Sequence, residues 1–374
     1  MGLAIAYFGT YEPAYPRNAV LLAGLREAGV ELHEFSAPLA HELSAAQMAT
    51  PGGAGVVAAD LARAHLQLFF DRQGDVRVDA LVVGYPGHFV VPFAKFVARQ
   101  WRAKLVFDPL VSLFDTFSGD RGLVGLRSPV GRALWVLDEA TFRLPDLVLA
   151  DTESQARYYR KALGVSPARL GVVPVGALPV PQATGSARRL PDDQPLVVFQ
   201  YGKWSPLHGA DAVLDAAERL AGEPFQFVLA GEGQLSADLQ ARIASRSLAN
   251  VVWLGMVSHD ELRARMLAAD VCLGVFGGSA KAARVVPNKV YDALACGRPL
   301  VTLDAAASRA ALDEGQAALL VPAGDGVALA EALRQLREFA VRARLGAAAL
   351  ALYRRRFTPP AVADRLLAAL EKVA

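Results

Sequence analysis

Short apolar runs alternate along the chain with longer segments in which apolar residues recur every three or four positions. The runs are typical of strands buried on both faces, and the periodic segments are typical of amphipathic helices. Because parallel strands need a crossover between them, this alternation predicts a parallel sheet with helices on both faces. In the first half the expected strands lie at 3–8, 30–35, 80–83, 105–107, 147–150 and 170–174, and the expected helices at 17–28, 56–72 and 91–102.

The alternation stops at residues 178–195, which contain Pro, Gly, Ser and polar residues without periodicity, and we interpret this segment as a linker. It then restarts, which predicts a second sheet of the same kind. The sequence therefore predicts an α/β protein with two Rossmann-like domains, at 1–177 and 196–356, and a C-terminal helix within 357–374. In the second half the expected strands lie at 196–200, 225–229, 251–254, 271–275 and 300–303, and the expected helices at 210–220, after Ser258, between Pro287 and Gly297, and at 359–373.

Residues 285–302 carry the most candidate chemistry. Pro287 suits the first position of a helix, and Gly297 suits the left-handed residue that ends it. Lys289 lies near the N-terminal end, where free backbone N–H groups favour an anion, and Asp292 follows one turn later on the same side. A cation with free amides can hold a phosphate, and a carboxylate beside it can hold a sugar diol. The alternative interpretation is a solvated Lys–Asp pair on an ordinary helix.

Composition narrows the class of protein. The 374 residues are enough for two domains, and the 53% apolar fraction with 20% charged residues excludes disorder as the main state. A net charge of +2 gives no reason to expect nucleic acid as a partner. Both cysteines, Cys272 and Cys296, lie in apolar runs and are expected to be buried, reduced thiols. The histidines show no metal-binding spacing, and we see neither a signal peptide nor a membrane span. We expect a cytoplasmic protein, soluble or peripheral on the inner face of the membrane.

The second half resembles the donor-binding half of retaining, nucleotide-sugar-dependent glycosyltransferases with two Rossmann-like domains, known as the GT-B fold, family 4. The resemblance covers nearly all of residues 196–340 and implies two domains that face each other across a cleft. It also implies that the C-terminal helix packs back on the first domain. The segments that match the family in order and spacing are 229–233, 250–255, 269–271 and 285–302, with 276–281 as in a variant branch.

The same resemblance implies a donor site. In the family a carboxylate on the central helix binds the donor ribose; here it is Asp292, where the family usually has Glu, and the family's other carboxylate is replaced by Arg284. The two cations that hold the diphosphate correspond to Lys203, which lacks the fork of Arg, and to His208, which is charged only if its pKa is raised. The residues expected to bind the donor are Gly9, Thr10, Arg17, Lys203, His208, Gly231, Glu232, Gly233, Val286, Pro287, Asn288, Lys289 and Asp292.

Candidates in the first half follow strands or open helices. Arg17 stands at a helix start, where its charge opposes the dipole, and this suggests use on an anion; chance placement on the surface is the alternative. His88, Asp115 and Asp120 are candidates to contact the acceptor hydroxyl. Their alternatives are a loop imidazole and two turn or capping carboxylates. The residues expected to take part in catalysis are Lys203, Lys289, Asp115, His88 and Lys281.

The helix expected at 91–102 places Phe93, Phe96 and Trp101 on one face and cations such as Arg99 on another. This arrangement suggests a surface for anionic lipid, and the alternative is an amphipathic helix packed on its sheet.

Taken together, the resemblance implies a hexosyl-type, retaining glycosyltransferase of polysaccharide biosynthesis. We expect a UDP- or GDP-sugar as donor, no obligatory cofactor or metal, and a saccharide or lipid-linked saccharide as acceptor. The alternatives are a sugar-nucleotide epimerase of the same fold and a catalytically degenerate, sugar-nucleotide-binding partner protein.

Overall fold

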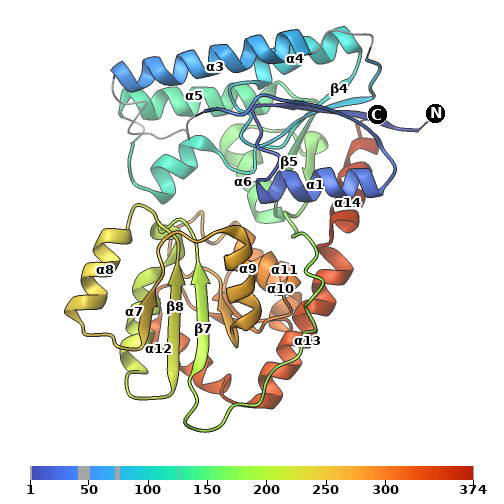
Figure 1. Ribbon diagram of the computed structural model, residues 1–374. Coiled ribbons are helices and arrows are strands. Elements are labelled where there is room, and N and C mark those ends of the chain that lie inside the picture. The colour runs from blue at the N-terminus through green and yellow to red at the C-terminus, as the bar shows by residue number, and fades with distance from the viewer. Residues whose placement is uncertain (1, 41–50, 72–75, 126, 374) are drawn as a thin grey trace. The chain divides into compact units, whose positions relative to one another are not determined.

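The computed structural model describes residues 2–40, 51–71, 76–125 and 127–373. The chain divides into two compact units (Figure 1). Unit 1 comprises Met1–Val175 and Thr358–Ala374, and unit 2 comprises Gly176–Phe357. The predicted fold class is confirmed, because each unit contains one six-stranded, parallel sheet with flanking helices. The domain boundaries expected from the sequence stay a prediction.

Unit 1 is a three-layer sandwich whose sheet has the order β2-β1-β3-β4-β5-β6. Side chains alternate between its faces along each strand: Ala6 and Phe8 point into one core, whereas Ile5 and Tyr7 point into the other. The strands are β1 (Ala4–Gly9), β2 (Glu31–Ser36), β3 (Ala80–Val83), β4 (Lys104–Phe107), β5 (Leu147–Ala150) and β6 (Leu170–Val172).

Two groups of helices cover the faces of this sheet (Figure 1). The first group is α3 (Pro51–Asp71), α4 (Val91–Trp101), α5 (Pro129–Arg143) and α6 (Glu153–Leu163), and the second is α1 (Pro16–Glu27) and α14 (Pro359–Glu371). The C-terminal helix lies directly on α1, since a Cβ atom added at Gly24 would lie 2.1 Å from the carbonyl oxygen of Pro359. The return of this helix to the first unit, expected from the resemblance, is confirmed.

Unit 2 has the sheet order β12-β11-β10-β7-β8-β9. Its strands are β7 (Leu196–Tyr201), β8 (Phe225–Ala230), β9 (Val251–Trp253), β10 (Val271–Leu273), β11 (Leu300–Leu303) and β12 (Leu319–Val321). Its α-helices are α7 (Ala210–Arg219), α8 (Ser236–Ser245), α9 (His259–Ala268), α10 (Asn288–Ala295), α11 (Ala306–Ala311), α12 (Gly326–Gln335) and α13 (Phe339–Arg356). The predicted left-handed end of α10 is confirmed, because Gly297 has a φ of +62°.

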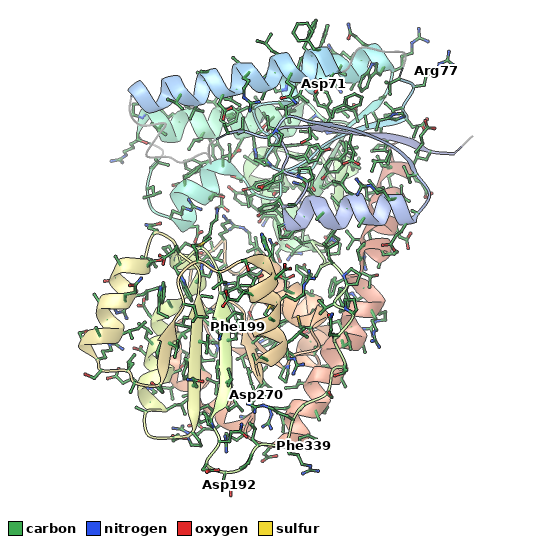
Figure 2. All side chains as sticks on the ribbon, viewed as in Figure 1. Asp71, Arg77, Asp192, Phe199, Asp270 and Phe339 are labelled. Carbon is green, nitrogen blue, oxygen red and sulfur yellow. The ribbon has the colours of Figure 1, made fainter. Side chains whose placement is uncertain are left out.

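The segment interpreted as a linker is irregular, and the structure bonds it to unit 2. Arg188 forms a bidentate pair with Asp270, and Arg342 donates to the carbonyl oxygen of Arg188. Asp270 lies at the amino end of the unit 2 sheet, where Asp192 also lies (Figure 2). The segment is therefore fixed along the edge of unit 2 that is opposite the carboxyl ends of the strands.

Some elements differ from the sequence prediction. The helix expected at 56–72 begins earlier, at Pro51. Residues 41–50, which precede it, lie outside the described residues. A short π-helix at Asp115–Asp120 was not expected. No helix in the described part of the chain is both long and apolar enough to span a membrane.

Candidate functional site

The carboxyl ends of β7, β8 and β10 lie side by side in unit 2, because these strands are neighbours in a parallel sheet. Each end leads into a glycine: Gly202 after β7, Gly231 after β8 and Gly274 after β10. In open parallel sheets, this edge is where ligands bind. α10 begins downstream of β10, and its first turn carries Lys289.

The loops after β7 and β8 pack backbone against backbone. A Cβ atom added at Gly231 would lie 2.1 Å from the carbonyl oxygen of Gly202, so only glycine fits there. The indole of Trp204 donates to the carbonyl oxygen of Gly231 across 3.1 Å and holds the two loops together. Gly231 therefore has a packing role of its own, and its approach to a nucleobase, together with that of Gly233, stays a prediction.

Lys289 is the second residue of α10, and its side chain is buried. Within the described residues its Nζ atom has no hydrogen-bond partner. Burial lowers the pKa of this amine to about 7. The helix starts after Pro287, which supplies no side-chain cap for the first-turn amides. A buried amine beside such a helix start is a place where an anion would be stabilised.

Asp292 lies one turn after Lys289 and is partly buried. The hydroxyl of Tyr201, the last residue of β7, donates to its Oδ2 atom. Burial raises the pKa of Asp292 to about 6, against the opposing effect of the Tyr201 hydroxyl and of Arg263 and His259 on α9. The solvated Lys–Asp pair that we weighed is wrong for this helix, because Lys289 is buried and Asp292 is bonded to a tyrosine.

His208 is buried and closes a capping box with Ser205, whose backbone N–H donates to the Nδ1 atom of the ring. Because Nδ1 accepts, the proton of the neutral ring lies on Nε2. A Cβ atom added at Gly202 would lie 2.3 Å from this Nε2 and 2.8 Å from Nζ of Lys289. Both nitrogens therefore flank Gly202, and His208 can donate a hydrogen bond to an anion there without being charged.

The remaining predicted donor residues of unit 2 follow β7 and β8 or lie at the start of α10. They differ from one another in how far they are exposed to solvent. Lys203 and Glu232 are exposed at the ends of β7 and β8. Val286 is buried, whereas Pro287 and Asn288 are partly buried at the start of α10. Lys281, which we expected to take part in catalysis, is 6% exposed in a turn between β10 and α10.

In unit 1 the predicted residues follow three neighbouring strands, β1, β3 and β4. Gly9 ends β1, and the hydroxyl of Thr10 donates to the carbonyl oxygen of Pro86 in the loop after β3. Asp115 and Asp120 bound the short π-helix after β4, and each is 8% exposed.

Asp138, which we did not single out from the sequence, fixes the loop after β4. It is fully buried on α5 and accepts hydrogen bonds from the Ser112 hydroxyl and from the backbone N–H groups of Leu113 and Phe114. The Ser112 hydroxyl in turn accepts from the N–H of Asp115. Asp138 therefore determines where Asp115 is placed.

Arg17 does not act as we expected. Its guanidinium is fully buried, donates to both carboxylate oxygens of Asp108, and also donates to the carbonyl oxygens of Val173 and Pro174. The anion that it holds is a carboxylate of this chain, so its assignment to the donor is corrected to a structural ion pair.

His88, which we expected to contact the acceptor hydroxyl, is buried. Its side chain is 1% exposed and packs edge-on against Phe107, and Nε2 donates to the carbonyl oxygen of Val111 across 2.9 Å. Burial lowers its pKa, although Asp138 acts in the opposite direction. A neutral histidine inside the core supports the loops around it, so its assignment to the acceptor is corrected.

The aromatic face of α4 is mostly used inside unit 1. Phe93 packs against Phe8, and Trp101 packs against Phe35, so the ordinary alternative of a helix packed on its sheet is right for both. Phe96 is 51% exposed, beside the exposed Arg99. The neighbouring α3 exposes a larger apolar stripe that was not predicted, consisting of Val56, Leu66, Phe69 and Phe70.

Comparisons with known proteins agree with this architecture. Two family models match the chain: "Glycosyl transferase 4-like domain" over residues 8–176 and "Glycosyl transferases group 1" over residues 195–338. The D-inositol 3-phosphate glycosyltransferase of Mycobacterium bovis is 30% identical over 252 residues, which are 63% of this chain and 50% of that protein. The chain spans between 26% and 50% of the length of the first curated relatives that it matches.

Solved structures show the same fold. Anabaena HepE, crystallised with UDP and glucose, has a TM-score of 0.65 and 16% identity, and the match covers 98% of this chain and 99% of that one. The sucrose-phosphate synthase of Thermosynechococcus elongatus has a TM-score of 0.68 and 17% identity, with 98% of each chain covered. At these identities the likeness concerns the fold alone.

Proposed function

Because this chain belongs to the GT-B, family 4-like glycosyltransferases, we propose that it transfers a sugar from a nucleotide-diphosphate sugar to a hydroxyl acceptor. Support for the donor comes from unit 2, where the predicted phosphate and ribose ligands gather at the carboxyl edge of the sheet. HepE, which has the same fold, was crystallised with UDP and with UDP-glucose. A UDP-sugar is therefore the first donor to test, and a GDP-sugar is the second.

The observation that carries this proposal is the buried amine of Lys289, which has no hydrogen-bond partner among the described residues. In our proposal the donor diphosphate lies against this amine, the first turn of α10 and the Nε2–H of His208. As the bond to the sugar breaks, negative charge grows on the leaving nucleotide. Groups already aimed at that charge stabilise the transition state more than the ground state.

Asp292 is proposed to hold the ribose. A carboxylate accepts hydrogen bonds from a diol, and its place one turn from Lys289 suits a ribose joined to a diphosphate. Lys203, exposed after β7, is proposed to add a second cation on the diphosphate. The family resemblance supports a retaining reaction without an obligatory metal, and the departure at Arg284 makes the stereochemical outcome a point to measure.

Unit 1 is proposed to bind the acceptor through the loop after β4, where Asp138 fixes the position of Asp115. For a lipid-linked acceptor, the exposed stripe on α3 and Phe96 of α4 offer apolar side chains, and the exposed Arg99 and Arg102 at the end of α4 offer cations for anionic headgroups. We therefore propose peripheral contact with the inner face of a membrane through this surface.

The test is incubation of the protein with UDP- and GDP-sugars, with and without saccharide or lipid-linked acceptors, followed by product analysis. Transfer to the acceptor with release of nucleoside diphosphate is the expected result. Conversion of the donor into another sugar nucleotide would favour the epimerase alternative. Tight binding with neither turnover nor hydrolysis would favour a degenerate binding protein.

A further inference from the structure

We propose that Tyr201 is a positioning residue for the donor: its hydroxyl fixes the carboxylate of Asp292 for the ribose, and its ring supports the amine of Lys289. This inference rests on the proposed function and adds a residue to it. Tyr201 did not stand out in the sequence as a ligand, because the expected strand ends at 200 and Tyr201 is the first residue after it; the structure extends the strand to Tyr201.

The position of Tyr201 follows from the sheet. Residues 199 and 201 of β7 point to the same face, and the rings of Phe199 and Tyr201 lie 6.3 Å apart in a stacked arrangement. Val198, one position out of phase, points into the opposite core. Because β7 is the neighbour of β10, Tyr201 ends the strand beneath α10, the helix that follows β10.

One side chain thus contacts both proposed donor ligands. Its hydroxyl donates to Oδ2 of Asp292, and its ring centroid lies 5.6 Å from Nζ of Lys289. In the part of the chain that the structure describes, Tyr201 is the hydrogen-bond partner of Asp292, so Oδ1 is left to accept from another donor. A carboxylate that is held at one oxygen presents the other in a fixed direction, which a ribose hydroxyl requires.

The charge of Asp292 depends on the same contact. Burial disfavours the carboxylate, whereas the Tyr201 hydroxyl and the α9 residues Arg263 and His259 favour it. Cys272 and Cys296 also lie on this side, and burial raises the pKa of both thiols, whereas the nearby Arg298 acts in the opposite direction. Removal of the hydroxyl raises the pKa of Asp292 further above its present value of about 6, so more of it is protonated near neutral pH.

Two substitutions separate the hydroxyl from the ring. Tyr201→Phe removes the hydrogen bond to Asp292 and keeps an aromatic face for Lys289, whereas Tyr201→Leu removes both. A matched control is Tyr353→Phe, which also removes a buried hydroxyl of unit 2, one that donates to the carbonyl oxygen of Ala177. If the loss of a buried hydroxyl only lowers stability, Tyr201→Phe and Tyr353→Phe should be affected alike. If it impairs ribose recognition, only Tyr201→Phe should be affected.

The experiment compares the affinity for UDP with that for 2′-deoxy-UDP and 3′-deoxy-UDP by calorimetry, at pH 6 and pH 8. The ratio of affinities isolates the contribution of the ribose hydroxyls, because all three ligands carry the same base and diphosphate. We expect the ratio of affinities, UDP over each deoxy analogue, to be about tenfold smaller in Tyr201→Phe than in the wild type at pH 6. At pH 8 the variant should recover part of this ratio. Tyr201→Leu should also weaken binding of all three ligands, and Tyr353→Phe should match the wild type.

Two results would overturn the proposal in different ways. If the wild type prefers UDP and folded Tyr201→Phe keeps the same preference at both pH values, Tyr201 has no positioning role, and the proposed function stands. If the wild type binds none of the nucleotides, nor GDP, the donor site itself is wrong, and the proposed function falls with this inference.

Discussion

Lys289 and His208 come from different segments of unit 2 and bring their side-chain nitrogens to the same glycine. A Cβ atom added at Gly202 would lie 2.8 Å from Nζ of Lys289 and 2.3 Å from Nε2 of His208. Both side chains are buried, and within the described residues no anion of the chain lies at hydrogen-bond distance from the amine. Such an arrangement destabilises the ligand-free protein and is retained, in our account, because the donor supplies the missing charge.

The first prediction is that Lys289→Met stabilises the ligand-free protein. Burial lowers the pKa of Lys289 from 10.5 to about 7, so between these values the unfolded chain binds more protons than the folded one. The stability of the wild type should therefore rise with pH across this window, and below it the cost of the buried charge is fully present. Calorimetric unfolding should give the variant a higher Tm at pH 6, with a smaller difference at pH 9.

Lys203→Met, which replaces an exposed lysine, serves as the control and should leave the dependence on pH unchanged. A Lys289→Met protein that is less stable than the wild type at pH 6 would mean that the amine has an anionic partner in solution.

The second prediction concerns protons taken up on binding. At pH 8 the amine of Lys289 is mostly neutral, and a diphosphate beside it raises its pKa. Binding of UDP should therefore take up close to one proton, which is measured by calorimetry in buffers of different ionisation enthalpy. Lys289→Met should take up none. Equal uptake by both proteins would place the titrating group elsewhere.

The third prediction separates Arg17 from the donor site. Arg17→Met leaves Asp108 buried without its partner, which should lower the free energy of unfolding by about 3–5 kcal/mol. The double variant Arg17→Met/Asp108→Leu should recover much of this loss, because no charge is left buried. UDP affinity should stay at the wild-type level in the folded double variant; a selective loss of affinity would restore Arg17 to the donor site.

Local sequence patterns predict the strands of this protein better than they predict contacts between distant residues. The strands at 80–83, 147–150 and 300–303 were predicted at their observed bounds, because short apolar runs between turn residues carry that information locally. The role of Arg17 depends on Asp108, and that of Tyr201 depends on Asp292, and each pair is separated by 91 positions. Neither partner was predicted, since a pattern along the chain does not show which distant side chains meet.

The donor site was predicted in part from the sequence. Lys289 and Asp292 were found from the sequence because a helix start and a one-turn spacing are local features. Their burial, and the resulting shifts of their pKa values to about 7 and about 6, depend on packing under α10 and were not predicted. His208 was doubted as a phosphate ligand on grounds of charge, and the bond from Ser205 to Nδ1 shows that it can donate while neutral.

The fourth prediction is that the α3 surface binds anionic vesicles. Co-sedimentation should rise with the anionic lipid fraction and fall with salt, because the attraction between exposed charges is screened. The double variant Phe69→Ser/Phe70→Ser should bind less, since it removes two exposed phenyl rings from the stripe on α3. Met256→Ser, which removes an exposed apolar side chain from unit 2, is the control. Equal, negligible binding to neutral and anionic vesicles would remove the membrane contact and leave a soluble acceptor.

The most direct test of the donor site is calorimetric titration of the wild type, Asp292→Asn and Lys289→Ala with UDP and with the UDP-sugar that gives turnover, combined with single-turnover transfer rates. Asp292→Asn replaces a charged acceptor by a neutral amide, so affinity for both ligands should fall about ten- to a hundredfold, because both carry the ribose. Lys289→Ala should lower the transfer rate more than the affinity. Wild-type affinity and rate in both folded variants would contradict the account and place the donor elsewhere in the protein.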